Sequence, residues 1–116
     1  MTIQDIVTIL KAKIIVADDL GLEIKTACGS DMMSDVLAFV KDQSALLTGL
    51  VNTQVLRTAE MMDMRCVILV RGKEPSAEMC DLAKKSGIAL LSTQYRLFTA
   101  CGLLYEKGLR GDRVDP

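Results

Sequence analysis

The chain contains no histidine and no tryptophan, and aromatic residues make up only 3% of its 116 residues. Without histidine, a serine or cysteine nucleophile would need lysine as its base, and no such pair has a recognisable sequence context here. The scarcity of aromatic residues also argues against binding of single-stranded nucleic acid, which relies on aromatic stacking. We therefore expect a protein that is not an enzyme and does not bind nucleic acid.

An excess of charge of one sign and long apolar runs are also missing. Fourteen basic residues stand against fifteen acidic ones, so no basic face for a polyanion is expected. Charged residues interrupt every apolar stretch before it reaches the roughly 18 residues of a membrane span. No pattern typical of a secretory signal is visible. We expect a cytoplasmic protein with no membrane partner.

The cysteines do not form a pattern that binds metal. The four of them, Cys28, Cys66, Cys80 and Cys101, include no C-x-x-C pair, and no imidazole is available to complete a zinc site. All four lie in apolar segments, and a reducing compartment disfavours disulfides. We expect them to be small buried core residues. The sequence thus predicts no metal and no other cofactor.

What the chain does contain is apolar aliphatic residues, which dominate its composition. Half of its residues are hydrophobic and its mean hydropathy is +0.29, which is high for a small domain with a large surface-to-volume ratio. Burial against a second copy would relieve this excess, so we expect a homodimer. Met61 falls opposite the apolar stripe of its predicted helix and is the candidate interface residue.

Two segments show one pattern, an apolar run that ends at a glycine and is followed by helical periodicity. They are 45–49 and 66–72. A continuous apolar run is what a strand covered on both faces requires. The repeated strand–helix unit predicts an α/β three-layer sandwich with a mostly parallel, mixed sheet. We expect one domain over residues 1–108 and a flexible tail over 109–116.

The other elements follow from periodicity and caps. Helices are predicted over 3–10, 32–40, 53–63, 77–86 and 94–107, and strands over 13–17, 22–28, 45–48, 66–70 and 88–91. Residues 22–28 alternate between apolar and polar, so the first two strands are predicted to form a hairpin at the sheet edge. The buried stripe of the last helix is predicted to comprise Leu97, Phe98, Cys101, Leu104 and Tyr105.

The turns after strands 45–48 and 66–70 form the candidate binding surface, because ligands of open α/β sheets lie off the carboxyl ends of strands. Helix starts attract anions, and Arg71 can bind a phosphate or carboxylate in bidentate fashion. The candidate effector-binding residues are Thr48, Gly49, Asn52, Arg71, Gly72 and Lys73. The alternative is structural: the glycines make turns, Asn52 caps a helix, and Arg71 pairs with a surface acid.

The order of elements from residue 29 to 105 resembles that of the DRTGG domain. The resemblance is closest in the segments Leu46-Leu47-Thr48-Gly49-Leu50, Ile68-Leu69-Val70-Arg71-Gly72-Lys73 and Gly87-Ile88-Ala89-Leu90-Leu91-Ser92-Thr93. The family's Gly-Asp-Arg and Thr-Gly-Gly would fall at 48–50 and 70–72, where only the final Gly72 matches.

The resemblance implies a fold similar to the amino-terminal domain of HPr kinase/phosphorylase. It also implies a regulatory or dimerising module without catalysis, as found alone, between the CBS modules of some inorganic pyrophosphatases, and beside phosphotransacetylase domains. We expect such a module here, with a small anionic effector at the strand-end turns. The alternative is an interaction subunit of a redox or signalling assembly, with a protein partner and no small-molecule ligand. The first predicts side chains that converge on one pocket, and the second predicts a flat apolar patch.

Overall fold

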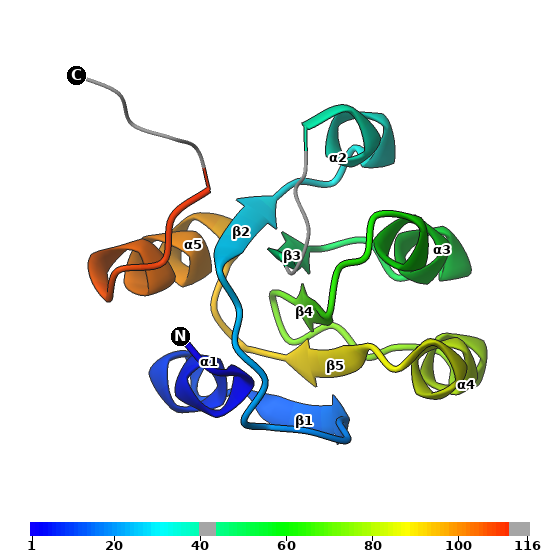
Figure 1. Ribbon diagram of the computed structural model, residues 1–116, viewed down its shortest axis with the longest axis horizontal. Coiled ribbons are helices and arrows are strands. Elements are labelled where there is room, and N and C mark those ends of the chain that lie inside the picture. Colours follow the sequence, from blue (N-terminus) through cyan, green and yellow to red (C-terminus); the bar gives the residue numbers. More distant parts are fainter. Residues whose placement is uncertain (40–43, 112–116) are drawn as a thin grey trace.

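The computed structural model describes residues 1–39 and 44–111, which form three layers (Figure 1). In chain order the elements are α1 (Ile3–Leu10), β1 (Lys13–Val16), β2 (Thr26–Gly29), α2 (Met33–Phe39), β3 (Ser44–Thr48), α3 (Thr53–Met61), β4 (Cys66–Leu69), α4 (Ala77–Ser86), β5 (Ala89–Ser92) and α5 (Leu97–Glu106). The predicted α/β sandwich is confirmed.

One five-stranded sheet, in the order β1-β5-β4-β3-β2, forms the middle layer. Strands β2 to β5 are mutually parallel, and β1 pairs antiparallel with β5. Every residue of β3, β4 and β5 is buried, which explains why their sequences are mostly apolar. The sheet is therefore mixed but mostly parallel, as predicted.

The helices divide between the two faces of the sheet. In Figure 1, α1 and α5 cover one face, and α2, α3 and α4 cover the other. Alternate strand residues accordingly enter two separate cores: Leu47 and Ile68 pack on the α1 and α5 side, and Leu46 and Val67 pack on the other side. The period of two along each strand thus distributes a single apolar run between two cores.

Local hydrogen bonds cap the helix ends, including the predicted cap at Asn52. Thr2 and Asp5 form a reciprocal capping box at the start of α1. Asn52 and Ser76 cap α3 and α4 by accepting backbone N–H bonds. Gly87 ends α4 with φ 68°, a left-handed conformation that glycine adopts without strain.

The predicted hairpin between the first two strands is wrong. Strands β1 and β2 lie at opposite edges of the sheet, and residues 17–25 cross from one edge to the other. The alternating segment bonds instead to the start of α1, where Ile3 N–H donates to Leu22 O and Ile24 N–H donates to Met1 O. Ile24 is buried in the core beneath α1, so the alternation marks an extended segment packed on a helix, not a ladder.

The end of the chain packs against the sheet further than expected. Leu109, within the predicted tail, is only 5% exposed. Ala27 N–H donates to Arg110 O, so residue 110 continues the sheet beyond β2. The rest of that tail, 112–116, lies outside the described residues, as does Val40 at the end of the predicted helix 32–40.

The predicted stripe of α5 is wrong at two positions. Phe98 is 90% exposed and Tyr105 is 52% exposed, whereas Ala100 and Leu104 face the core. The helix is apolar around most of its circumference, so its sequence does not mark which face is inward.

Only one of the four cysteines is as buried as predicted. Cys66 is fully buried in β4, and burial raises the pKa of its thiol to about 12. Cys28, Cys80 and Cys101 are half-buried, and none of the four cysteines forms a disulfide in the described structure. Cys28 and Cys101 pack on opposite faces of the sheet.

No helix in the described part of the chain is both long enough and apolar enough to cross a membrane.

Two buried threonines give the first prediction. Within the described residues the hydroxyl of Thr58, on α3, has no hydrogen-bond partner, whereas the equally buried Thr48 hydroxyl donates to Asp31 Oδ1 at 2.9 Å. An unpaired buried hydroxyl is destabilising, so Thr58→Val should raise the free energy of unfolding by about 1 kcal/mol. The matched control Thr48→Val should lower it by a similar amount. Urea denaturation measures both, and a destabilised Thr58→Val would contradict the prediction.

Candidate functional site

The carboxyl ends of the four parallel strands lie along one edge of the sheet. Asp31 follows β2, Gly49 follows β3, Arg71 follows β4 and Gln94 follows β5. Parallel pairing in continuous register requires this, because equivalent ends of neighbouring strands come together. Four segments far apart in the sequence therefore meet at one place.

Asp31 connects the first two of these turns. Its Oδ1 accepts the Gly49 N–H at 2.8 Å and the Thr48 hydroxyl at 2.9 Å. The Gly49 N–H is the main cause that lowers the pKa of the Asp31 carboxyl, with the Thr48 hydroxyl and the nearby Arg71 charge adding to it. The carboxylate is therefore a fixed negative charge at neutral pH.

Arg71 holds a backbone conformation that non-glycine residues seldom adopt. Its φ is 60° and that of Gly72 is 67°, so two consecutive residues are left-handed. Backbone bonds hold the turn: Arg71 N–H donates to Tyr95 O, and Gly72 N–H donates to Thr93 O, both at 2.8 Å. Such a conformation costs about 1–3 kcal/mol in a residue with a side chain and persists only when neighbours fix it.

The turn directs the Arg71 side chain across to the neighbouring strand. A Cβ built on Gly49 would lie 2.6 Å from Arg71 Nη2, so the guanidinium rests directly over Gly49. The side chain of Arg71 is exposed and, among the described residues, forms no hydrogen bond and no ion pair. Its charge therefore lies at the strand-end edge with its donors available to a ligand.

Gly72 accommodates a second side chain. A Cβ there would lie 2.6 Å from Gln94 Oε1, so the amide of Gln94 packs on the Gly72 backbone. The two glycines of the predicted site thus share one structural role. Each leaves room for a longer polar side chain from the next turn.

The other predicted site residues have structural partners. Asn52 Oδ1 accepts the Val55 N–H and caps α3, as the structural alternative expected. Lys73 is exposed, and its carbonyl accepts the Ser92 hydroxyl at 2.8 Å. The structure therefore brings Thr48, Gly49, Arg71 and Gly72 together with two residues that were not singled out as effector ligands, Asp31 and Gln94.

The sequence carried only part of the signal for these two. Asp31 follows the turn at Gly29, and its position before a predicted helix indicates a helix cap. Gln94 follows a predicted strand and belongs to no recognisable sequence motif. Only the alignment of the strand ends shows that both side chains face the predicted turns.

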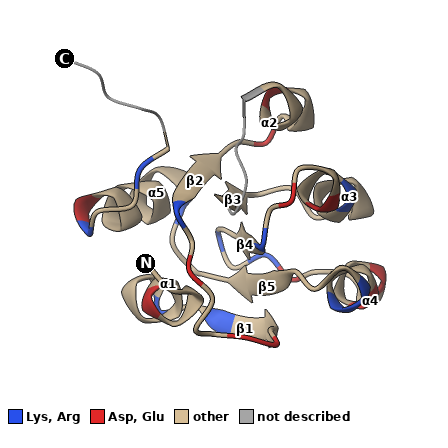
Figure 2. Cartoon of the chain, in the orientation of Figure 1, with Lys and Arg blue, Asp and Glu red and all other residues tan. Residues whose placement is uncertain are grey.

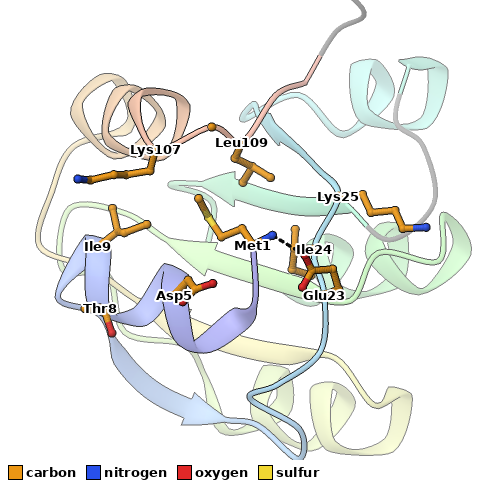
Figure 3. A pocket seen from close by; sticks show the side chains of 10 residues that line it. Met1, Asp5, Thr8, Ile9, Glu23, Ile24, Lys25, Lys107 and Leu109 are labelled. Atoms are coloured by element: carbon orange, nitrogen blue, oxygen red, sulfur yellow. Dashed lines mark hydrogen bonds and ion pairs between the residues drawn. The ribbon is translucent and has the colours of Figure 1, made fainter.

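A wide groove opens elsewhere, beneath the start of α1 and the end of α5 (Figure 3). It holds about 570 Å³ and has a mixed lining, with Asp5, Lys25 and Lys107 around apolar side chains. The terminal ammonium of Met1 pairs with Glu23 at 2.7 Å within it. None of the predicted effector-binding residues lines this groove.

The model of the DRTGG domain family matches residues 5–106. The chain belongs to the DRTGG domain family. The match covers most of the chain even though Asp-Arg is absent at 49–50 and Thr-Gly at 70–71, so it does not depend on the residues that give the family its name. No curated protein matches the chain.

A solved structure shares this DRTGG fold. It is the regulatory region of Clostridium perfringens pyrophosphatase, with CBS and DRTGG domains, in complex with its activator diadenosine tetraphosphate. The TM-score is 0.73 at 20% sequence identity, over 89% of this chain and 45% of that one. This chain therefore spans less than half of the pyrophosphatase region that it matches.

Asp31 gives the second prediction. Because its folded pKa is lowered, its charge stabilises the fold above the unfolded pKa, and this stabilisation is lost as the pH falls through the folded pKa. Asp31→Ala should lower the free energy of unfolding at pH 7 by about 1 kcal/mol, a modest loss because the carboxylate is exposed. The difference from the parent should shrink below pH 4, which urea titrations at several pH values measure. Asp31→Asn, which keeps an accepting oxygen, should lose less at pH 7, and a loss that grows towards low pH would contradict the assignment.

Proposed function

We propose that this DRTGG domain is a non-catalytic regulatory module that forms a homodimer and binds a small anionic effector at Arg71. One observation carries the proposal. An exposed guanidinium that forms no hydrogen bond and no ion pair among the described residues is held over Gly49 by a strained turn, with the Asp31 carboxylate nearby. A strained residue at a strand-end turn is a recurring feature of ligand sites.

The position of Asp31 refines where the anion binds. The Gly49 N–H, which would otherwise be available to an anion, already donates to the Asp31 carboxylate. An effector phosphate or carboxylate is therefore expected on the guanidinium of Arg71 and not on the backbone at the start of α3. Gln94, packed on Gly72 beside this turn, supplies an amide that can both donate and accept.

The pyrophosphatase relative supports nucleotides as the first ligands to test. Its regulatory region holds a dinucleoside polyphosphate activator, and nucleotides carry the phosphates that an arginine binds well. That region also contains CBS domains, which this chain does not span, so the activator identifies a class of probe and not the effector itself.

A second candidate function is an interaction subunit without a small ligand. The exposure of Phe98 favours it, because an almost fully exposed phenylalanine is typical of a contact surface. The two functions differ at Arg71. Effector binding requires its charge, whereas protein docking through Phe98 does not.

The third prediction tests the effector. Purified protein is heated with ATP, ADP, AMP, diadenosine tetraphosphate or inorganic phosphate, each over a concentration series. A ligand present at 100 times its Kd stabilises the folded state by about 2.7 kcal/mol, which a melting curve detects.

Arg71→Ala should weaken the binding of an active probe by about 10- to 150-fold, as expected for the loss of a charged hydrogen bond. Arg57→Ala, which removes an exposed arginine from α3, is the matched control and should bind like the parent. Equal binding by Arg71→Ala would place the site elsewhere. A lack of stabilisation by all five probes would favour the interaction subunit.

A further inference from the structure

The outward face of α5 is unusually apolar. Phe98 and Tyr105 project from it, and Gly102 lies between them with nothing within 4 Å of an added Cβ. Their spacing of four and then three residues places all three on one face of the helix, opposite the buried Ala100 and Leu104. Two aromatic side chains therefore flank an open glycine in the described structure.

This face also differs from the other helix surfaces in charge. Residues 97–105 include no charged side chain, and α5 is tan over most of its length in Figure 2, whereas α3 and α4 carry acidic and basic residues. One charge from outside the helix borders this face: the guanidinium of Arg110 lies over the Tyr105 ring, 3.8 Å from its centroid, and leaves the rest of the ring exposed. Met61, the interface residue expected from the sequence, is 74% exposed on α3, but Arg57 and Glu60 lie on the same helix and are also exposed. An apolar side chain among charges is common on protein surfaces, whereas a helix that is apolar all round is usually covered.

We propose that two copies of this chain dimerise through α5, with the two helices antiparallel across a two-fold axis near Gly102. The inference rests on the homodimer of the proposed function and assigns its surface. A two-fold contact must be self-complementary, because the same patch meets itself. The spacing of residues on α5 satisfies this condition.

Residues at equal distances on either side of the axis face each other in such a pair. Phe98 and Tyr105 are equidistant from the point between positions 101 and 102, so Phe98 of each copy meets Tyr105 of the other. Aromatic pairs of this kind are favourable beyond the area they bury. Gly102 lies at the crossing, where the absence of a side chain allows a close approach of the helices.

Charges at the two ends of the helix complement this arrangement. Arg96 precedes α5 and Glu106 ends it, and in the described residues neither side chain forms an ion pair or a hydrogen bond. Both are exposed and nearly equidistant from the same axis. An antiparallel pair places Arg96 of each copy near Glu106 of the other, so two reciprocal ion pairs border the aromatic centre.

The area buried in the α5 contact sets the expected affinity of the dimer. A buried aromatic side chain contributes about 150–250 Å², so Phe98 and Tyr105 at their exposures supply roughly 250–300 Å² per copy. A standard interface needs about 800 Å² per partner. The two aromatic side chains therefore supply only about a third of a standard interface, so the contact is weak and we expect a Kd no tighter than the micromolar range.

The decisive experiment is analytical ultracentrifugation of the parent, Phe98→Ala and Met61→Ala over about 1–500 μM, the range that brackets a micromolar Kd. The parent should dimerise. Phe98→Ala should weaken the dimer by about 1,000-fold, because a buried aromatic anchor is typically worth about 30-fold and occurs twice in a two-fold dimer. Since Phe98 is almost fully exposed, the variant should keep the far-ultraviolet circular dichroism of the parent.

Met61→Ala, an exposed apolar residue on the other side of the sheet, should dimerise like the parent. A parent that is still monomeric at about 500 μM would overturn the dimer itself, because even a small specific interface should associate at that concentration. A Phe98→Ala variant that dimerises normally would overturn the α5 surface alone. Loss of the dimer in Met61→Ala but not in Phe98→Ala would place the interface on α3.

Charge reversal tests the antiparallel register. Arg96→Glu brings like charges together twice and should weaken the dimer by roughly 5- to 10-fold, as exposed pairs contribute little each. Adding Glu106→Arg in the same chain should restore the parent affinity. Failure of the double variant to recover would exclude this register. Arg71→Ala should dimerise normally, so loss of effector binding and loss of the dimer are separable results.

Discussion

Parallel pairing of four strands, buried on both faces, is the constraint on which the candidate site depends. Because β2, β3, β4 and β5 run in the same direction and in register, their final residues lie side by side. Each turn that follows has to leave a buried strand and enter a helix or loop at the same edge. The polar side chains of Asp31, Arg71 and Gln94 thus converge beside the backbone of Gly49 and Gly72 without being close in sequence.

At this edge, the Asp31 carboxylate and the two glycines Gly49 and Gly72 determine which polar groups remain available to a ligand. The Asp31 carboxylate accepts a hydrogen bond from the Gly49 N–H, and the absence of a side chain at Gly49 leaves space for the guanidinium of Arg71. The Arg71 backbone is fixed by Tyr95 O in a left-handed conformation that an arginine would not adopt by itself. The charge is consequently positioned by the fold, while its hydrogen-bond donors remain available.

The same loop links this site to the apolar surface of α5. Tyr95 O accepts a hydrogen bond from the Arg71 N–H, Thr93 O accepts one from the Gly72 N–H, and this loop leads directly into the helix that carries Phe98. A second segment of the site also touches α5. Gly29, which lies two residues before Asp31, packs against the side chains of Cys101 and Leu97. The proposed effector site and the proposed dimer surface therefore border the same two segments, an arrangement that suits a regulatory module of the DRTGG family.

The layers, the parallel core and most helix ends follow from local patterns in the sequence. Short apolar runs such as 45–47 and 66–69 indicate strands covered on both sides, and Thr2, Asn52 and Ser76 mark helix starts through local hydrogen bonds. The sequence also indicated Gly49 and Arg71 as neighbours, because parallel strands align their ends. These features depend on contacts within a few residues or on a single periodicity.

Other features depend on contacts between segments that are distant in the chain. The segment 22–25 alternates like a strand, yet its partner is α1, and no local pattern specifies that choice. Helix α5 is apolar on nearly every side, so only its packing on the sheet shows that Phe98 faces outward. Asp31 carries the mark of a helix cap and becomes a ligand of the neighbouring turn only when β2 and β3 lie side by side. The physical reason is the same in each case: local patterns record whether a residue favours burial or a hydrogen bond, whereas the partner is set by segments distant in the chain.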